Sequence, residues 1–329
     1  MRKKLLITIF AIVSFSFVFG NTGWSDTILF PYAVKSGTVT TFFSIVNHSS
    51  GASHLKYIYR HRDAAAANTT NLSDSQIFDR PTSDDDVVTF DMSGLFNSGN
   101  ALFNDSDSYG GTFHLTASGS KRAIFLVSHS DGTNRKDVGN NNALIGEAII
   151  MDIALGAAWG YKALNDNSAE DYSFTTSGLN NNTLRGEAST FTFFPTSEWT
   201  TRFFVTPIGN NMDSANISAT VAVDNKASLG ASGPLFSETA YGICDRDSSC
   251  TEGGSAITVT GLGAINIDDF LDATQETAVE NTGGYGLFLQ SVSAGLQDVV
   301  VYKLEFVLSD PTYGGTNNST YCLSCEPDI

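Results

Sequence analysis

Residues 38–46 read Thr-Val-Thr-Thr-Phe-Phe-Ser-Ile-Val and consist almost entirely of β-branched and aromatic side chains. These residue types fit the pleated, half-buried surface of a β-strand. Residues 47–53 follow, and they are rich in Asn, Ser and Gly, which are typical of turns. The stretch therefore predicts a strand that ends in a turn, and the same unit recurs along the chain.

Similar runs predict further strands at 55–61, 87–92, 112–116 and 123–128. Polar turn clusters such as 97–100 separate them. Helical periodicity is scarce, and its best candidates are 63–67 and 267–277. Many short strands joined by turns favour an all-β fold of β-sandwich modules with minor helical insertions over an α/β fold.

The chain carries three matches between its halves, and they occur in the same order. Leu29-Phe30-Pro31 followed by residues 40–43 is similar to Phe193-Phe194-Pro195 followed by residues 200–204. Further on, residues 89–95 are similar to 264–270, and residues 109–115 to 285–289. The spacing widens along the chain, as an insertion in the second copy requires. The matches predict two tandem, duplicated modules at 21–175 and 176–318, followed by a Cys-containing tail at 319–329.

The apolar strand end Ser44-Ile45-Val46-Asn47, its polar turn and the alternating strand after it resemble part of a known class of module. They are similar to the immunoglobulin-like and fibronectin-like sandwich modules of bacterial surface proteins. The resemblance covers about the first half of each module and includes no functional motif. It implies adhesive, spacer, sugar-binding or assembly roles, among which the fold does not choose.

The N-terminal residues have the three-part form of a secretory signal. Arg2, Lys3 and Lys4 precede an apolar stretch from Leu5 to Phe19, and the small residue Gly20 follows. This pattern predicts a signal peptide at 1–20 and an exported protein, located in the periplasm, on the outer cell surface or in the medium. An uncleaved membrane anchor is the alternative, which the short apolar stretch disfavours. No later apolar run is long enough for a membrane helix, so we expect no span after signal removal.

The four cysteines lie in the C-terminal third, at Cys244, Cys250, Cys322 and Cys325. An even number of cysteines behind a signal peptide indicates two disulfides. Three pairings are open, and the spacing favours the local ones, Cys244–Cys250 and Cys322–Cys325. A redox dithiol or half of a zinc site is the alternative for the second pair, although such a dithiol usually opens a helix.

Composition bounds the function more broadly. The chain has 329 residues, of which 41% are apolar and 16% charged, with 18 Lys and Arg against 35 Asp and Glu. The apolar content excludes a mostly disordered protein. The net charge of −17 argues against a nucleic-acid partner.

Calcium is the one cofactor that the sequence suggests. Asp105 and Asp107 stand at alternate positions of a loop whose sixth residue is glycine, as in hard-cation loops, but Thr116 replaces the usual twelfth-position glutamate. Asp245 and Asp247 form a second candidate, in which a cysteine replaces the glycine. Solvated turns of an acidic protein are the alternative reading of both loops.

The chain shows no catalytic signature of the common hydrolase, nucleotide-binding or zinc-protease types. His61 ends the strand face that carries Tyr57 and Tyr59, and we interpret it as an ordinary strand-end histidine. A zinc or catalytic role is the alternative, which would need partners from distant strands. Trp199 lies beside a Phe-rich strand and is assigned to the core. No catalytic residue is therefore predicted.

These observations favour an exported, non-catalytic cell-surface or matrix protein that acts through adhesion, assembly or spacing. Its partners would be further copies of itself or a surface polysaccharide or protein. One alternative is a carbohydrate-binding or carbohydrate-cleaving jelly-roll protein. Another is a periplasmic subunit of an envelope complex, which an exposed apolar patch or an open sheet edge would favour.

Overall fold

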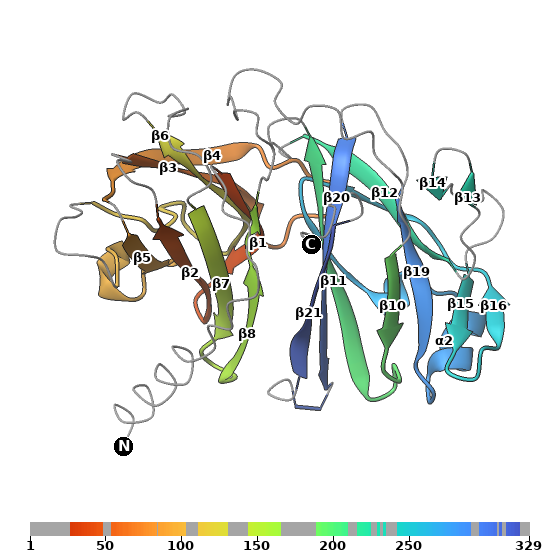
Figure 1. The fold of residues 1–329 in the computed structure, drawn as a ribbon. Coiled ribbons are helices and arrows are strands. Elements are labelled where there is room, and N and C mark those ends of the chain that lie inside the picture. The colour runs from red at the N-terminus through yellow and green to blue at the C-terminus, as the bar shows by residue number, and fades with distance from the viewer. Residues whose placement is uncertain are drawn as a thin grey trace.

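The computed structural model describes residues 27–48, 54–83, 85–102, 111–130, 144–165, 189–209, 216–224, 229–230, 233–234, 242–290, 296–307, 309–310 and 314–322. It is mostly β, as predicted, and its strands form several antiparallel sheets. Figure 1 shows the N-terminal and C-terminal halves of the chain lying side by side. The predicted signal peptide lies outside the described residues.

The strands of the first half are β1 (Thr27–Lys35), β2 (Val39–Asn47), β3 (His54–Asp63), β4 (Asp74–Pro81), β5 (Asp86–Asp91), β6 (Lys121–Ser130), β7 (Leu144–Asp152), β8 (Ala157–Lys162) and β9 (Leu164–Asn165), with a 3-10 turn η1 (Asn97–Gly99). They form one sheet in the order β4-β3-β6-β1-β9 and a second in the order β5-β2-β7-β8. The strands predicted at 38–46, 55–61, 87–92 and 123–128 are confirmed as β2, β3, β5 and β6.

The strands of the second half are β10 (Ser189–Phe193), β11 (Trp199–Gly209), β12 (Ser218–Asp224), β13 (Leu229–Gly230), β14 (Gly233–Pro234), β15 (Gly242–Asp245), β16 (Cys250–Glu252), β17 (Ile257–Thr260), β18 (Gly263–Asn266), β19 (Gly284–Gln290), β20 (Leu296–Val307) and β21 (Gly314–Cys322). One sheet has the order β16-β15-β19-β12-β17, with β10 also paired to β19, and another has the order β18-β11-β20-β21. A 3-10 turn η3 (Ile267–Asp269) and a helix α2 (Ala273–Val279) lie between β18 and β19.

The core of the first half is aromatic, and both of its sheets contribute to it. Phe125 on β6 lies 4.5 Å from Phe43 on β2 and 4.3 Å from Tyr59 on β3, measured between ring centroids. Such ring pairs add about 0.5–1.5 kcal/mol beyond the burial of their area. Gly146 on β7 leaves room for the ring of Phe30 in the same core, because a Cβ there would lie 2.6 Å from that ring. Alternation along the strands therefore places aromatic side chains from both sheets in one buried cluster.

The second half has its own buried cluster, which includes Phe203, Phe270 and Phe288. A buried ion pair connects its two sheets at β10. Lys303 donates to the Thr192 carbonyl at 2.5 Å and to Glu305 at 3.0 Å, and Glu305 accepts the backbone N–H of the residue after β10 at 3.1 Å. The charges are thus paired and hydrogen-bonded, which a buried pair requires.

Two local predictions are wrong. Residues 112–116 form no strand, because they cross the end of the core as irregular chain, with the N–H groups of Phe113 and Leu115 bonded to Gly99 and Met92. Residues 63–67 form the end of β3 and a turn instead of a helix. The helical expectation at 267–277 is confirmed by η3 and α2.

α2 begins where its sequence provides a cap. The Asp272 carboxylate accepts the N–H groups of Thr274 and Gln275, both at 2.9 Å. The expected boundary between the modules, at 175 and 176, lies outside the described residues. β21 continues to Cys322, so the first residues of the expected tail at 319–329 belong to a strand. Within the described part of the chain, no helix is long and apolar enough to cross a membrane.

Candidate functional site

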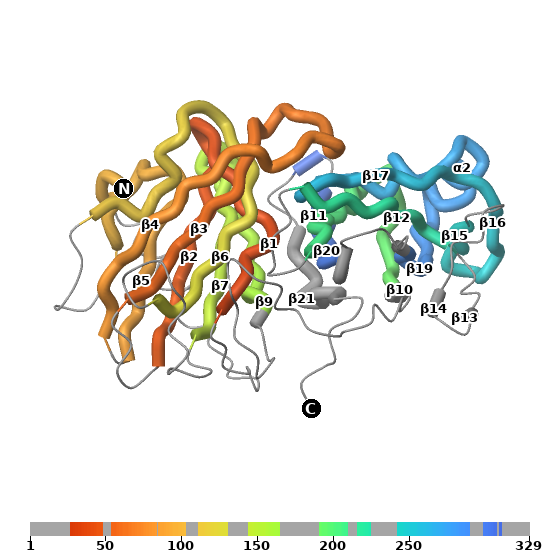
Figure 2. The backbone as a smooth tube through the Cα atoms, turned by 90° about the horizontal axis from the view of Figure 1, so that it is seen from above, coloured from red at the N-terminus to blue at the C-terminus, as the bar shows by residue number. Residues whose placement is uncertain are grey.

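The most extensive feature that joins distant parts of the sequence is an apolar cluster between the two halves, here called the seam. Its buried members are Leu29, Tyr32, Ile58, Leu72, Ile124, Leu126, Ile150, Phe204, Ile208, Leu262, Val300, Tyr302 and Leu304. Most of them come from one face of β1, β3 and β6 and from β11 and β20 of the other half. Ile150 lies on β7, and Leu72 and Leu262 lie in the connections between strands. Figures 1 and 2 both show β1 beside β11 and β20.

The local sequence explains why the first half offers an apolar outer face. Residues 123–127 of β6 read Ala-Ile-Phe-Leu-Val, so both faces of this strand are apolar. Phe125 points into the first core, whereas Ile124 and Leu126 point into the seam. A strand that is apolar on both faces is buried on both, and here the second half provides the outer cover.

Aromatic contacts cross the seam at two places. The rings of Tyr32 and Phe204 lie 4.2 Å apart, and those of Tyr161 and Tyr302 lie 4.8 Å apart. Two side-chain hydroxyls also donate across it, from Thr206 to the Pro31 carbonyl at 2.6 Å and from Tyr302 to the Lys162 carbonyl at 2.8 Å. The hydroxyl of each bridging residue is therefore satisfied by the opposite half.

Arg62 connects the halves through its guanidinium group. Its side chain is only 3% exposed and lies at the end of β3. It donates to the carbonyls of Thr260 at 3.1 Å and Leu262 in the second half, and also to those of Thr70 and Asn68 in its own half. Burial lowers its pKa to about 10. The cation therefore remains charged at neutral pH and is held by backbone oxygens from both halves.

Asn68, in the turn between β3 and β4, pairs with the edge of two strands in the second half. Its side-chain amide donates to the Ala264 carbonyl at 3.1 Å and accepts the Ala264 N–H at 3.3 Å. Its backbone carbonyl accepts the Thr260 N–H at 2.8 Å. Asn68 thus binds at the point where β17 ends and β18 begins, and it pairs edge groups that the second half's own strands leave open.

Positive charge gathers at one part of the seam. Burial raises the pKa of the Tyr32 phenol, and the nearby guanidinium groups of Arg122, Arg202 and Arg62 oppose that rise. Burial also lowers the pKa of Arg202, and Arg122 lowers it further. The three cations therefore lie within electrostatic range of one phenol, although the chain as a whole is acidic.

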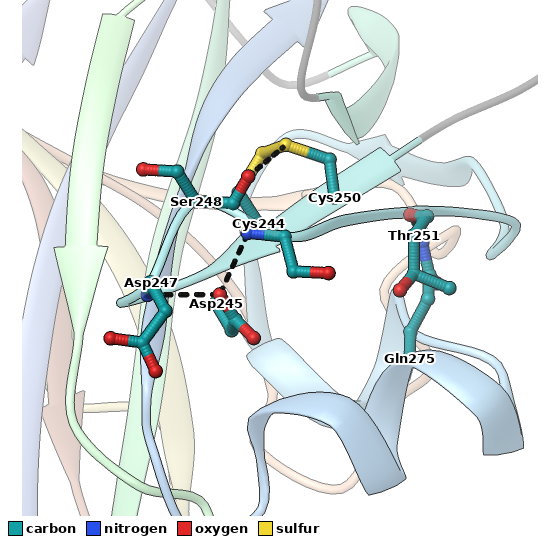
Figure 3. Close-up of a disulfide and its surroundings, with 8 residues drawn as sticks. Cys244, Asp245, Asp247, Ser248, Cys250, Thr251 and Gln275 are labelled. Carbon is teal, nitrogen blue, oxygen red and sulfur yellow. Dashed lines mark hydrogen bonds between the residues drawn. A yellow bond between two sulfur atoms is a disulfide. The ribbon is translucent and has the colours of Figure 1, made fainter.

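The predicted disulfide Cys244–Cys250 is present and joins the paired strands β15 and β16 (Figure 3). The turn that it closes is fixed by Asp245, whose Oδ1 accepts the N–H groups of Asp247 and Ser249, both at 2.9 Å. In Figure 3 the Asp245 side chain points toward these turn residues. The first disulfide therefore closes a tight hairpin at a sheet edge.

The calcium predictions remain predictions. The Asp245 carboxylate holds its own turn, and that of Asp247 is exposed, with Arg246 at 3.9 Å. Among the described residues, no cluster of three or more His, Cys, Asp or Glu side chains could hold a metal ion. Asp105 and Asp107 lie outside the described residues. The second cysteine pair does too, because Cys325 and the side chain of Cys322 are not described.

The sequence assigned His61 to a strand end and Trp199 to the core, and the structure places the two residues differently with respect to these assignments. His61 lies at the end of the core face of β3, 5% exposed, and its Nδ1 has no hydrogen-bond partner among the described residues. Burial lowers its pKa. Trp199, assigned to the core, is only partly buried and packs on the ring of Phe194 at 4.6 Å. Phe194 itself is 50% exposed.

The sequence indicated no contact between the halves for Arg62 or Asn68. Their partners are backbone groups about 200 residues away, which carry no side-chain signal. One sequence feature pointed to the seam, namely the two-faced apolar run at 123–127. Comparisons of the chain with protein-family models, curated proteins and solved structures find no match.

Proposed function

We propose that this chain is an exported, non-catalytic cell-surface or matrix protein that acts through adhesion, assembly or spacing. In this proposal two duplicated β-sandwich modules, at 21–175 and 176–318, form one rigid unit that keeps its outer faces in fixed relative positions. The seam is the observation that carries the proposal. Export is supported by the signal-like residues 1–20, which place the work in the periplasm, on the outer surface or outside the cell.

The strand orders support the duplication. The sheet order β5-β2-β7-β8 of the first half corresponds to β18-β11-β20-β21 of the second half. Likewise, β4-β3-β6-β1 corresponds to β17-β12-β19-β10. In both sheets the corresponding strands also follow one another in the same order along the chain. The β15–β16 hairpin is then an insertion in the second copy. Two of the three sequence matches fall on equivalent strands. The third joins β19 to residues before β6, so its equivalence is not supported.

Rigidity is the property that a spacer or assembly unit needs. Modules joined by a linker usually move relative to one another unless their interface is large and apolar. Here the seam combines an apolar cluster with hydrogen bonds from Arg62 and Asn68. Bending at the seam would expose apolar surface and leave backbone groups unpaired, and both changes are unfavourable.

Solution scattering and electron microscopy of oxidised residues 21–329, with and without calcium, test the proposal. We expect a particle of one fixed shape that matches the two joined halves, and regular polymers or sheets at high concentration. Polymers would direct attention to the exposed sheet edges. A broad distribution of inter-module distances would contradict the rigid unit, and turnover of a polysaccharide would contradict the non-catalytic role.

A second candidate function, carbohydrate binding, is favoured by one observation. The half-exposed ring of Phe194 packs against Trp199, and Tyr285 on β19 is also exposed. Exposed aromatic rings are the surfaces on which sugar rings stack. A glycan array read with wild type and Phe194→Ala tests this, with Leu155→Ala, an exposed apolar residue in the β7–β8 turn, as the control. Glycan binding that only Phe194→Ala removes would support it, and binding unchanged in both variants would exclude this surface.

A further inference from the structure

Three arginines from the two halves converge beside Tyr32 at the seam. Arg62 on β3 and Arg122 on β6 are direct cross-strand partners, so their side chains leave the same face of the sheet. Arg202 on β11 lies two residues before Phe204, whose ring packs on Tyr32, and therefore shares the face that meets the first half. Arg122 and Arg202 are partly exposed, so solvent reaches them.

This arrangement is electrostatically unfavourable as it stands. Like charges at directly opposed positions of neighbouring strands destabilise a sheet. Among the described residues, no carboxylate forms an ion pair with any of the three arginines. The carboxylate of Asp269 raises the pKa of Arg202 electrostatically, but the two side chains form no ion pair. Backbone carbonyls hold Arg62, but the described part of the chain provides no ion-paired carboxylate for Arg122 or Arg202, so an anion there would be favourable.

The three side chains also hold unused hydrogen-bond donors. Nε of Arg62 is buried and has no acceptor among the described residues. Arg202 donates through Nε to Asn266 at 2.9 Å, and no bond of its terminal nitrogens falls within the described residues. Arg122 makes no side-chain hydrogen bond in the described part of the chain. Planar guanidinium groups with free donors match the oxygens of phosphate and sulfate.

We propose that the seam contains a binding site for a tetrahedral oxyanion, a phosphate or sulfate group, held by Arg122 and Arg202 from opposite halves with Arg62 beneath them. The anion neutralises the repulsion between Arg62 and Arg122 and accepts the donors that are free. Because it contacts both halves, it also strengthens their association. The site is independent of the proposed surface role.

Thermal unfolding of the full chain in sodium sulfate, sodium phosphate and sodium chloride, at equal ionic strength, tests the site. Sulfate stabilises most proteins through exclusion from their surface, so the comparison between variants is decisive. The variants are Arg122→Gln and Arg202→Gln, with Arg246→Gln as the control, because Arg246 is an exposed arginine in the β15–β16 turn. For a tenfold excess of anion over Kd, linkage predicts a rise in Tm of about 2 °C beyond the effect of chloride.

We expect this extra rise in wild type and Arg246→Gln, and its loss in both seam variants. Without oxyanion, Arg122→Gln should have a higher Tm than wild type, because the repulsion with Arg62 is removed. An equal rise in all four proteins would overturn the proposal, since it would be a general salt effect. So would an Arg122→Gln variant less stable than wild type in chloride.

Calorimetric titration of wild type gives a readout that does not depend on how the variants fold. Inorganic phosphate and sulfate test a free anion, and glucose 6-phosphate tests a sugar-borne monoester. Saturable binding of any of them with one site per chain supports the site and identifies the form that it accepts. Absence of saturable heat with all of them, at concentrations up to tens of millimolar, would overturn it.

Discussion

Replacement of Asn68 by alanine tests whether a single turn residue holds the two halves together. The side-chain amide makes two hydrogen bonds to Ala264, at 3.1 and 3.3 Å, and both cross the seam. Alanine keeps the backbone contact between the Asn68 carbonyl and the Thr260 N–H but removes the two side-chain bonds. The variant therefore leaves the N–H and the carbonyl of Ala264 without partners at a partly buried strand edge.

The expected cost follows from these two bonds. A typical intramolecular hydrogen bond contributes about 0.5–1.5 kcal/mol, so Asn68→Ala should lower the free energy of unfolding by about 2 kcal/mol. For a protein of 329 residues, such a loss lowers Tm by about 3 °C. Asn71→Ala is the matched control, because Asn71 lies in the same connection between β3 and β4 and is exposed.

Urea unfolding followed by circular dichroism measures the loss, and amide hydrogen exchange locates it. We expect faster exchange at Ala264 in Asn68→Ala and unchanged exchange in Asn71→Ala. The core of the first half, for example Phe125, should keep its protection in both variants. Equal stability of the two variants, or unchanged exchange at Ala264, would refute the argument that Asn68 pairs the edge of β18.

Three other predictions concern separate parts of the molecule. Phe204→Ala should destabilise the protein by about 3–5 kcal/mol, because it opens a cavity in the seam. Calorimetry should then show two unfolding steps where wild type shows one, and a single sharp step in the variant would argue that the seam does not couple the two halves. Cys250→Ser should lower the free energy of unfolding by about 2 kcal/mol, because a short covalent loop is lost. A protease should also cut the 245–249 turn faster in this variant than in wild type, and equal cleavage rates would show that the turn needs no disulfide. Burial holds the pKa of His61 below its ordinary 6.5, despite the opposing charge of Asp74, so the unfolded chain binds a proton more readily than the folded one. The free energy of unfolding should therefore fall as the pH drops below about 6.5. In urea unfolding measured from pH 7 to 5, His61→Gln should reduce that fall. An identical dependence of the free energy of unfolding on pH in both proteins would exclude His61 as the cause.

Local sequence determined the features whose causes are local. The β-branched and aromatic run at 38–46 became β2 because its alternating side chains suit a strand with one face in the core. The pair Cys244–Cys250 was predictable because a polar turn of five residues returns the chain to the same place. The helical periodicity at 267–277 likewise indicated where η3 and α2 form, although the cap at Asp272 was not identified from the sequence.

Long-range packing decided the rest. Residues 112–116 have the composition of a strand but cross the end of the core, and their N–H groups bond to Gly99, Met92 and the side chain of Gln76 instead of to one neighbouring strand. The apolar outer face of β6 could be read from Ile124 and Leu126, but not which segment covers it, since any apolar surface of suitable shape would serve.

The seam's polar contacts were beyond the sequence for a specific physical reason. The acceptors of Arg62 and the partners of Asn68 are backbone groups of residues 260–264, and every residue has a carbonyl. Only the fold brings those groups to the end of β3. The sequence by itself thus determined an all-β chain with a disulfide-closed hairpin, and the tertiary structure decided that its two halves share one buried apolar seam with three arginines at one part of it.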